Sequence, residues 1–356
     1  MRVILAVSAI VLVVGFLILL QGGISVANGQ MYANGLLPAV PIPADNPMTD
    51  AKIRLGEQLY FDGRLSSDGT ISCASCHDPK KAWADSGPVS EGVAHQKGTR
   101  NSPSIIDSAY IIPQFWDGRA VHLEKQAVGP VQNPVEMDLT VEEFDYRLSH
   151  LPGYVAQFRE VFGAAPNIEL MAKAIAAFER TIVTGDSPYD MYLKGDRMAM
   201  SKSAMRGMHI FNGKGHCNVC HSGPAFSDSS FHNLGAGYSG GKYKDVGRYE
   251  VTKNPRDMGA FLTQRLRNVA LTPPYMHDGS EPTLEAVVEF YNRGGVPNPN
   301  LDHTMVPLNL SKSEKKDLVA FMEALTGPFP ITEPPALPDP EITAQDLSRM
   351  MKEGVR

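Results

Sequence analysis

The chain holds four cysteines, and each of two cysteine pairs is followed at once by a histidine. The segments Cys73–His77 and Cys217–His221 both read C-x-x-C-H and leave no cysteine over. Two thiols three residues apart lie on one helical turn and can bond to the two vinyl groups of one haem. The adjoining histidine then reaches the iron as an axial ligand. The pattern predicts two covalently attached haem c groups, held by Cys73, Cys76, His77, Cys217, Cys220 and His221.

Two other uses of such cysteine pairs are a zinc ribbon and a thioredoxin-like dithiol. A structural zinc ion needs four ligands around one centre, whereas the two pairs lie far apart in the sequence. An exported chain would normally join its cysteines as disulfides. The C-x-x-C-H form of both pairs therefore favours haem.

Helical patterns flank both motifs. Apolar residues recur on one face over 51–62 before the first motif and over 202–211 before the second. Amphipathic patterns over 168–182 and 311–325 close the two modules, and Ser311 with Glu314 forms a capping-box pattern. We therefore expect an all-α fold of two tandem cytochrome c-like haem domains. Their expected bounds are 47–186 and 187–327, followed by a Pro-rich C-terminal tail over 328–356 that runs as an extended strap.

An uncharged, apolar run from Val3 to Leu20 follows Arg2 at the start of the chain. Its length lies between that of a signal-peptide core and that of a membrane span, and Ala27 offers a cleavage position. Residues 1–30 are thus predicted to be a cleaved signal peptide or a retained N-terminal membrane anchor, with the rest exported to the periplasm. The formal net charge of −6 over 356 residues disfavours nucleic acid as a partner.

From about Pro47 to Thr326 the chain resembles the bacterial di-haem cytochrome c peroxidases and their MauG-like relatives. The stretches that carry the resemblance occur in the family's order around both motifs: Gly63–Ser67, Gly98–Pro103, Gln114–Arg119, Gly129–Met137 and Leu266–Gly279. The resemblance implies that His77 holds the peroxidatic haem, where hydrogen peroxide is reduced. It implies that His221 holds the electron-transfer haem.

The resemblance also implies roles for single residues. Trp116 matches a tryptophan that relays charge between the haems, and Glu136 and Gln126 match the polar pair of the distal peroxide pocket. A distal carboxylate can move a proton between the peroxide oxygens, and burial would raise the pKa of Glu136 toward neutrality. One calcium ion is implied by the residues that match the family's ligands: Asn101, Thr272 and Pro274.

Two positions depart from the peroxidases that need reductive activation. Where a loop histidine fills the sixth position of their resting peroxidatic haem, this chain has Val93, with His95 two residues on. Because valine cannot bind iron, we expect an open, five-coordinate peroxidatic haem. Where their second haem has a methionine ligand, this chain has Tyr291, as MauG-like proteins do, and a phenolate favours the more oxidised iron. Tyr291 is the predicted axial ligand opposite His221, with Met305 as its rival.

Three functions remain open at this point. The first is a MauG-like di-haem peroxidase that reduces hydrogen peroxide at the His77 haem. It would oxidise a partner through the His221 haem by way of high-valent irons, and the partner is a small redox protein or a protein substrate. The second is an ordinary cytochrome c peroxidase that detoxifies peroxide with electrons from a small redox protein. The third is a non-enzymatic di-haem electron carrier. We favour the first, an oxidoreductase that acts on peroxide.

Overall fold

The computed structural model describes residues 35–354, which all belong to one compact unit of the chain. The segment predicted to direct export, residues 1–30, lies outside this range. Within residues 35–354, every helix is too short or too polar to cross a membrane.

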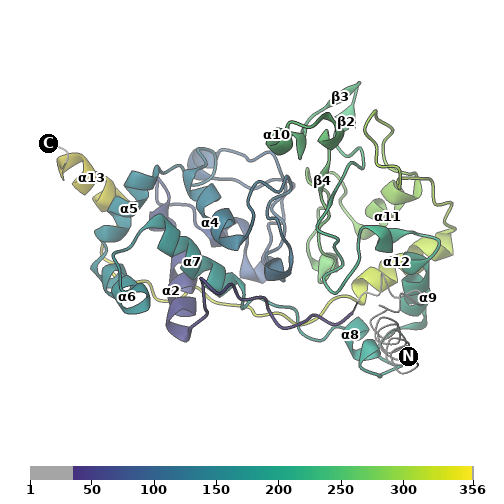
Figure 1. Ribbon diagram of the computed structural model, residues 1–356, viewed down its shortest axis with the longest axis horizontal. Coiled ribbons are helices and arrows are strands. Elements are labelled where there is room, and N and C mark those ends of the chain that lie inside the picture. Colours follow the sequence, from purple (N-terminus) through teal and green to yellow (C-terminus); the bar gives the residue numbers. More distant parts are fainter. Residues whose placement is uncertain (1–34, 355–356) are drawn as a thin grey trace, which may run out of the picture. The chain divides into compact units, whose positions relative to one another are not determined.

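Most of the regular structure is helical (Figure 1). The helices of the first half are α2 (Asp50–Phe61), α3 (Cys73–Cys76), α4 (Leu123–Gln132), α5 (Val141–Ser149), α6 (Pro152–Phe162) and α7 (Ile168–Glu179). Those of the second half are α8 (Pro188–Leu193), α9 (Lys202–Asn212), α10 (Tyr249–Thr252), α11 (Leu284–Asn292) and α12 (Lys312–Glu323), and α13 (Ala344–Gly354) follows. The four helices expected around the motifs correspond to α2, α7, α9 and α12. The capping box predicted for Ser311 and Glu314 is confirmed at the start of α12.

The fold also contains short β-structure that the expectation of an all-α fold missed. Strand β1 (Phe231–His232) pairs antiparallel with β4 (Phe261–Leu262), and β2 (Tyr238–Ser239) pairs with β3 (Lys242–Tyr243). Each strand is two residues long, too short to leave a period-2 pattern in the sequence. The fold is therefore predominantly helical rather than all-α.

Each half is built on a pair of helices that approach closely at a glycine. In the first half, α2 packs on α7, and a side chain at Gly56 would overlap the carbonyl group of Ala174. In the second half, α9 packs on α12, and a side chain at Gly207 would overlap the carbonyl group of Asp317. Separate hydrophobic cores surround the two pairs. Both halves thus contain a helix pair that packs closely at a glycine, next to the C-x-x-C-H motif in the sequence.

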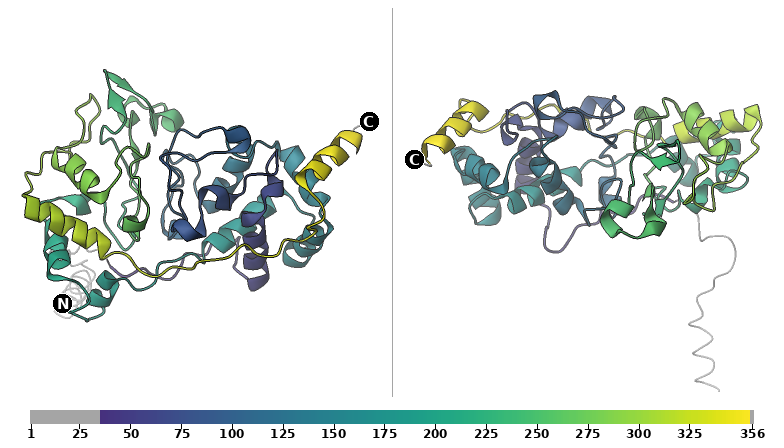
Figure 2. Two further views of the ribbon diagram at one scale, coloured as in Figure 1. Left: turned by 180° about the vertical axis from the view of Figure 1, so that it is seen from behind. Right: turned by 90° about the horizontal axis from the view of Figure 1, so that it is seen from above.

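The chain after α12 returns to the first half. Figures 1 and 2 show it as a thin yellow segment that runs back from α12 to α13. Trp83 Nε1 donates a hydrogen bond of 2.7 Å to the carbonyl of Pro330, and Arg64 donates to the carbonyls of Pro338 and Asp339. Leu347 of α13 is fully buried in the first core. The tail is an extended strap as expected, but it ends in a helix that the sequence pattern did not predict.

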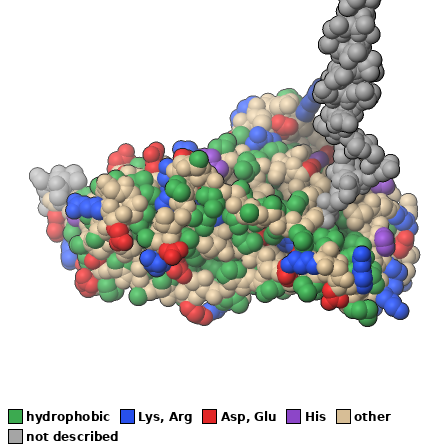
Figure 3. Space-filling model, turned by 60° about the horizontal axis from the view of Figure 1, so that its bottom comes forward, with side chains coloured by type: hydrophobic (Ala, Val, Ile, Leu, Met, Phe, Trp, Pro, Cys, Tyr) green, Lys and Arg blue, Asp and Glu red, His purple; other side chains and the backbone are tan. Residues whose placement is uncertain are grey.

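The surface of this unit carries charges of both signs. On the face shown in Figure 3, Lys and Arg side chains are interspersed with Asp and Glu among apolar ones. Each C-x-x-C-H motif, by contrast, lines a cavity of this unit.

Candidate active site

The first motif forms one wall of a cavity with an empty volume of about 1340 Å³. Helix α3 is a single turn closed by a Ser72–Ser75 capping box, so both thiols of the motif lie on one wall. Burial raises the pKa of Cys76 to about 11, and raises that of Cys73 further. These neutral, half-buried thiols lie where thioether bonds to a haem would replace them.

His77 follows this turn as a half-buried, neutral imidazole. Burial lowers the pKa of His77 to about 4, against the weaker effect of nearby backbone carbonyls. Its Nδ1 is buried and makes no hydrogen bond of regular geometry with the described residues. Iron binds the neutral form of histidine, so an axial ligand would fit here. The Tyr60 hydroxyl donates a hydrogen bond of 3.0 Å to the His77 carbonyl and so fixes the backbone of the motif.

Glu136 and Gln126 line the same cavity. Gln126 lies on α4, which ends at the cap residue Asn133, and the Glu136 amide donates a hydrogen bond of 2.9 Å to the Asn133 carbonyl. Burial raises the pKa of Glu136, while a hydrogen bond from Asn133 Nδ2 partly opposes the shift. A carboxyl whose pKa is raised by desolvation can both accept and return a proton.

The loop that carries Val93 lies directly behind Glu136. The Val93 amide donates a hydrogen bond of 2.9 Å to the Glu136 carbonyl, and the Val93 side chain is 2% exposed. The His95 side chain is 91% exposed and pairs with Glu91 at 2.6 Å. Among the described residues that line this cavity, His77 is the one histidine. The arrangement therefore brings no second histidine to the first cavity.

The second motif lines another cavity, with an empty volume of about 1790 Å³. A 3-10 turn, η5 (Cys217–Val219), carries the motif, and burial raises the pKa of Cys217 to about 12. His221 Nδ1 lies 3.0 Å from the Phe226 carbonyl. A histidine anchored through Nδ1 turns Nε2 toward a metal. This geometry fits an axial ligand.

Tyr291 and Met305 both line the second cavity. Tyr291 lies on α11, where burial raises the pKa of its hydroxyl and the thiols of Cys217 and Cys220 lie near. Its hydroxyl makes no hydrogen bond with any described residue. By contrast, the hydroxyls of Tyr60 and Tyr275 each donate to a backbone carbonyl at 3.0 Å. An unpaired phenol in a cavity is suited to binding a metal.

Some residues line both cavities and form the wall between them. Trp116, Asn101 and Arg265 belong to this wall. The Leu262 amide donates a hydrogen bond of 2.8 Å to the Trp116 carbonyl, so β4 holds the tryptophan loop. A charge that moves between the two cavities would pass this wall.

The residues expected to bind calcium share one cavity. Asn101, Thr272 and Pro274 all line the second cavity. The Asn101 side chain donates from Nδ2 to the Gly87 carbonyl at 3.2 Å, so its amide oxygen points away from that bond. Amide and carbonyl oxygens are ligands that calcium prefers, and the donor set fits this ion.

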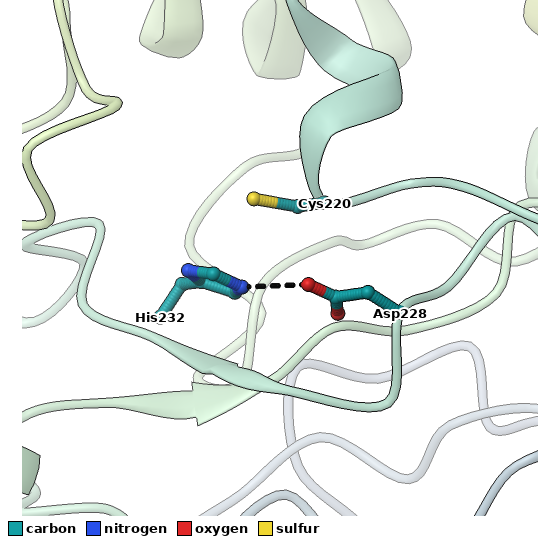
Figure 4. Close-up of side chains that lie close together, drawn as sticks. All are labelled: Cys220, Asp228 and His232. Carbon is teal, nitrogen blue, oxygen red and sulfur yellow. Dashed lines mark hydrogen bonds and ion pairs between the residues drawn. The ribbon is translucent and has the colours of Figure 1, made fainter. Parts of the chain in front are cut away.

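Sequence reasoning missed a group of polar side chains beside Cys220, drawn in Figure 4. His232 Nε2 lies 3.0 Å from Asp228, and its Nδ1 lies 2.7 Å from Asp302. These contacts, the Asp228 bond first, raise the pKa of His232 to about 11. Cys220, Asp228 and His232 are close enough to share a metal ion, but a thioether at Cys220 would remove the thiolate that such an ion needs. The spacing of Asp228 and His232, four residues apart, was the available signal.

Two cavities, each with C-x-x-C-H on its wall and a half-buried neutral histidine, define a di-haem c-type protein. A family model described as "Di-haem cytochrome c peroxidase" matches residues 50–198. Cytochrome-c peroxidase IdrP1 of Denitromonas iodatirespirans is 42% identical over 338 residues, covering 86% of this chain and 89% of that protein. Methylamine utilization protein MauG of Methylorubrum extorquens is 39% identical over 299 residues, covering 83% and 84%.

A solved structure gives the same result. The crystal structure of a MauG-like protein associated with microbial copper homeostasis has a TM-score of 0.75 and 32% identity. The match covers 85% of this chain and 96% of that one. The chain belongs to the di-haem cytochrome c peroxidase family, whose members are oxidoreductases that act on peroxide and carry two haem c groups.

Proposed function

We propose that this chain is a MauG-like di-haem peroxidase with two tandem haem domains, 47–186 and 187–327. In this proposal, peroxide is reduced at the haem held by His77, and the electrons come from a partner through the haem held by His221. The observation that carries it is the asymmetry of the cavities. The first has a buried acid, Glu136, and no second histidine among its described residues, whereas the second has Tyr291 and Met305.

Haem iron supplies the centre at which peroxide binds and accepts electrons. Glu136 takes the proton from the inner peroxide oxygen and returns it to the outer oxygen, which leaves as water. Gln126 donates its amide hydrogens to the peroxide and orients it. Trp116 carries electrons across the wall between the cavities. In total, one peroxide, two protons and two electrons give two waters.

Tyr291 and His221 would together hold the iron of the second haem. A phenolate stabilises an oxidised iron, which suits a centre that shares oxidising equivalents. Met305 in the same cavity favours the alternative, an ordinary cytochrome c peroxidase, because a thioether favours the reduced iron. The partner is a small redox protein or the side chain of a protein substrate. The periplasm is the proposed location, with residues 1–30 as a cleaved signal or an inner-membrane anchor.

Electron paramagnetic resonance of the resting ferric protein tests this function. We expect one high-spin signal from the open haem and one low-spin signal from the other. Peroxide should also produce a near-infrared charge-resonance band in the MauG-like case, and no such band in an ordinary peroxidase. Two low-spin signals and no response to peroxide would leave the electron carrier as the function.

One calcium ion completes the proposal, held by Asn101 and by the carbonyls of Thr272 and Pro274. Removal of calcium with a chelator should change the spin state of the ferric protein, because Asn101 also contacts Trp116 in the wall. Calcium but not magnesium should restore it, since a calcium site accepts more ligands at longer distances. An unchanged spectrum in protein shown by elemental analysis to be free of calcium would contradict the site.

A further inference from the structure

Arg265 lies in the wall between the two cavities without a carboxylate partner. Its Nε donates to the carbonyl of Ile106, and it makes no ion pair with any described residue. Part of its surface stays accessible, and because the residue lines both cavities, this part faces them. A guanidinium has five donors, so this anchor leaves most of them unused.

The other arginines that line the cavities are all neutralised. Arg100 pairs with Asp117 and Asp245 at 2.6 Å each. Arg119 also pairs with Asp117, at 3.0 Å, and Arg267 pairs with Asp190 at 2.8 Å. Among the cavity-lining arginines of residues 35–354, Arg265 alone makes no ion pair.

Two acids, Asp107 and Glu179, lie close enough to interact electrostatically with Arg265, but neither forms an ion pair with it. Asp107 already accepts hydrogen bonds from the backbone and the hydroxyl of Thr184. Burial raises the pKa of Glu179 to about 8, so this acid is mostly neutral at pH 7. Burial lowers the pKa of Arg265 only to about 10, so the guanidinium keeps its charge. A charge of this kind inside a protein is costly unless it is paired.

We propose that Arg265 binds haem propionate groups from both cavities and couples the two haems electrostatically. Propionates are the carboxylates that each haem brings into its cavity, and a planar guanidinium fork matches a carboxylate. This inference rests on the proposed two-haem function. Arg265 acts here as a positioning residue: it would orient the haem groups and place one positive charge in the wall between the two cavities.

The charge of Arg265 shifts the reduction potentials of the two haems in one direction. A nearby positive charge disfavours the ferric state, which is one unit more positive than the ferrous state. Arg265 therefore raises the reduction potential of both haems. Loss of the charge should lower the reduction potentials of both haems. The low polarity of the protein interior weakens such an interaction less than water would.

The test compares Arg265→Gln and Arg265→Lys in the full-length protein with both haems attached. Spectroelectrochemical titration should show both midpoint potentials more negative in the Gln variant and near the parent values in the Lys variant. Resonance Raman bands of propionate bending should shift in both variants, because lysine lacks the fork. Arg206→Gln is the matched control: it removes the same charge from an exposed arginine that pairs with Asp317, and it should change neither potential.

Haem content, measured as the pyridine haemochrome per chain, separates this inference from the proposed function. Two haems per chain with unshifted potentials in Arg265→Gln would overturn the role of Arg265 and leave the two-haem site intact. A shift at one haem alone would overturn the sharing of the arginine. If the Gln variant does not accumulate, parent-like propionate bands in Arg265→Lys would equally contradict it. Fewer than two haems in the parent protein would instead contradict the proposed function.

Discussion

The indole Nε1 of Trp116 donates a hydrogen bond of 2.8 Å to the backbone carbonyl of Asn101. Both residues line both cavities. The backbone amide of Asn101 in turn donates a hydrogen bond of 2.7 Å to the carbonyl of His277. Backbone groups from both halves of the unit thus fix the plane of the indole, which is what a relay between two redox centres requires.

Trp116→Phe should abolish the near-infrared band that peroxide produces, because a phenyl ring is harder to oxidise and lacks the Nε1 donor. The lost hydrogen bond should lower the free energy of unfolding by about 1 kcal/mol, and both haems should stay attached. Trp83→Phe is the matched control, since Trp83 also donates to a carbonyl, at 2.7 Å from Pro330, but lies in the first core. Retention of the band in Trp116→Phe would exclude the relay.

Glu136→Gln should slow peroxide consumption by about 10²–10⁴-fold, the usual cost of losing a positioned acid–base group. Stopped-flow measurement of the reaction with peroxide gives this rate. In the parent protein the rate should fall as the pH drops through the pKa of Glu136, because the protonated acid cannot accept the first proton. The fall should occur at a higher pH than for an exposed glutamate, since burial raises this pKa.

Glu91→Gln is the control for that experiment. Glu91 lines the same cavity but pairs with the exposed His95, so its variant should keep the parent rate and pH profile. If Glu136→Gln also keeps both, Glu136 is not the proton carrier.

Tyr291→Phe should remove the phenolate ligand and convert the low-spin ferric signal of the second haem to high spin. Both thioether attachments should survive, which mass spectrometry of the intact chain can check. Met305→Leu keeps the size of the rival ligand without its sulfur and should leave the low-spin signal unchanged. The reverse pattern, a normal spectrum in Tyr291→Phe and a changed one in Met305→Leu, would assign the ligand to Met305.

Glu179→Gln should change how stability depends on pH. The folded-state pKa of Glu179 is about 8, above its ordinary value of 4.5, because of burial. The folded protein therefore keeps a proton that the unfolded chain releases, and stability falls as the pH rises from about 4.5 to 8. Denaturant titrations should show that the Gln variant lacks this loss, gaining on the order of a few kcal/mol over the parent by pH 8. The exposed Glu160→Gln should follow the parent curve, and a parent-like curve for Glu179→Gln would contradict the raised pKa.

Local patterns predicted the helices beside the motifs, since apolar periodicity and caps act within a few residues. Gly56 lies inside α2, where glycine is less favourable than alanine, and its missing side chain allows α7 to approach. Nothing in the sequence around Gly56 names Ala174 as its neighbour, because that contact depends on the packing of the two helices. Helix α13 was missed for a similar reason, since Leu347 is buried against residues of the first half far away in the sequence.

The site divides in the same way. Spacing alone predicts that the cysteines and histidines of the two C-x-x-C-H motifs bind haem, because these residues are adjacent in the sequence. Arg265 could not be recognised from its neighbours in sequence. Arg265 stands out because it has no carboxylate partner. This can be seen only in the folded structure, where the residues of the wall between the cavities come together.

Because the tail returns to the first half, it determines which fragments of this chain can fold. The strap after α12 hydrogen-bonds to Trp83 and Arg64, and Leu347 completes the first core. A fragment cut out as residues 47–186 would lose that cover and expose an apolar surface, so single-haem versions would need the last segment spliced back. Conversely, a protease that clips the tail would loosen the half nearer the start of the chain, with the latter half left whole.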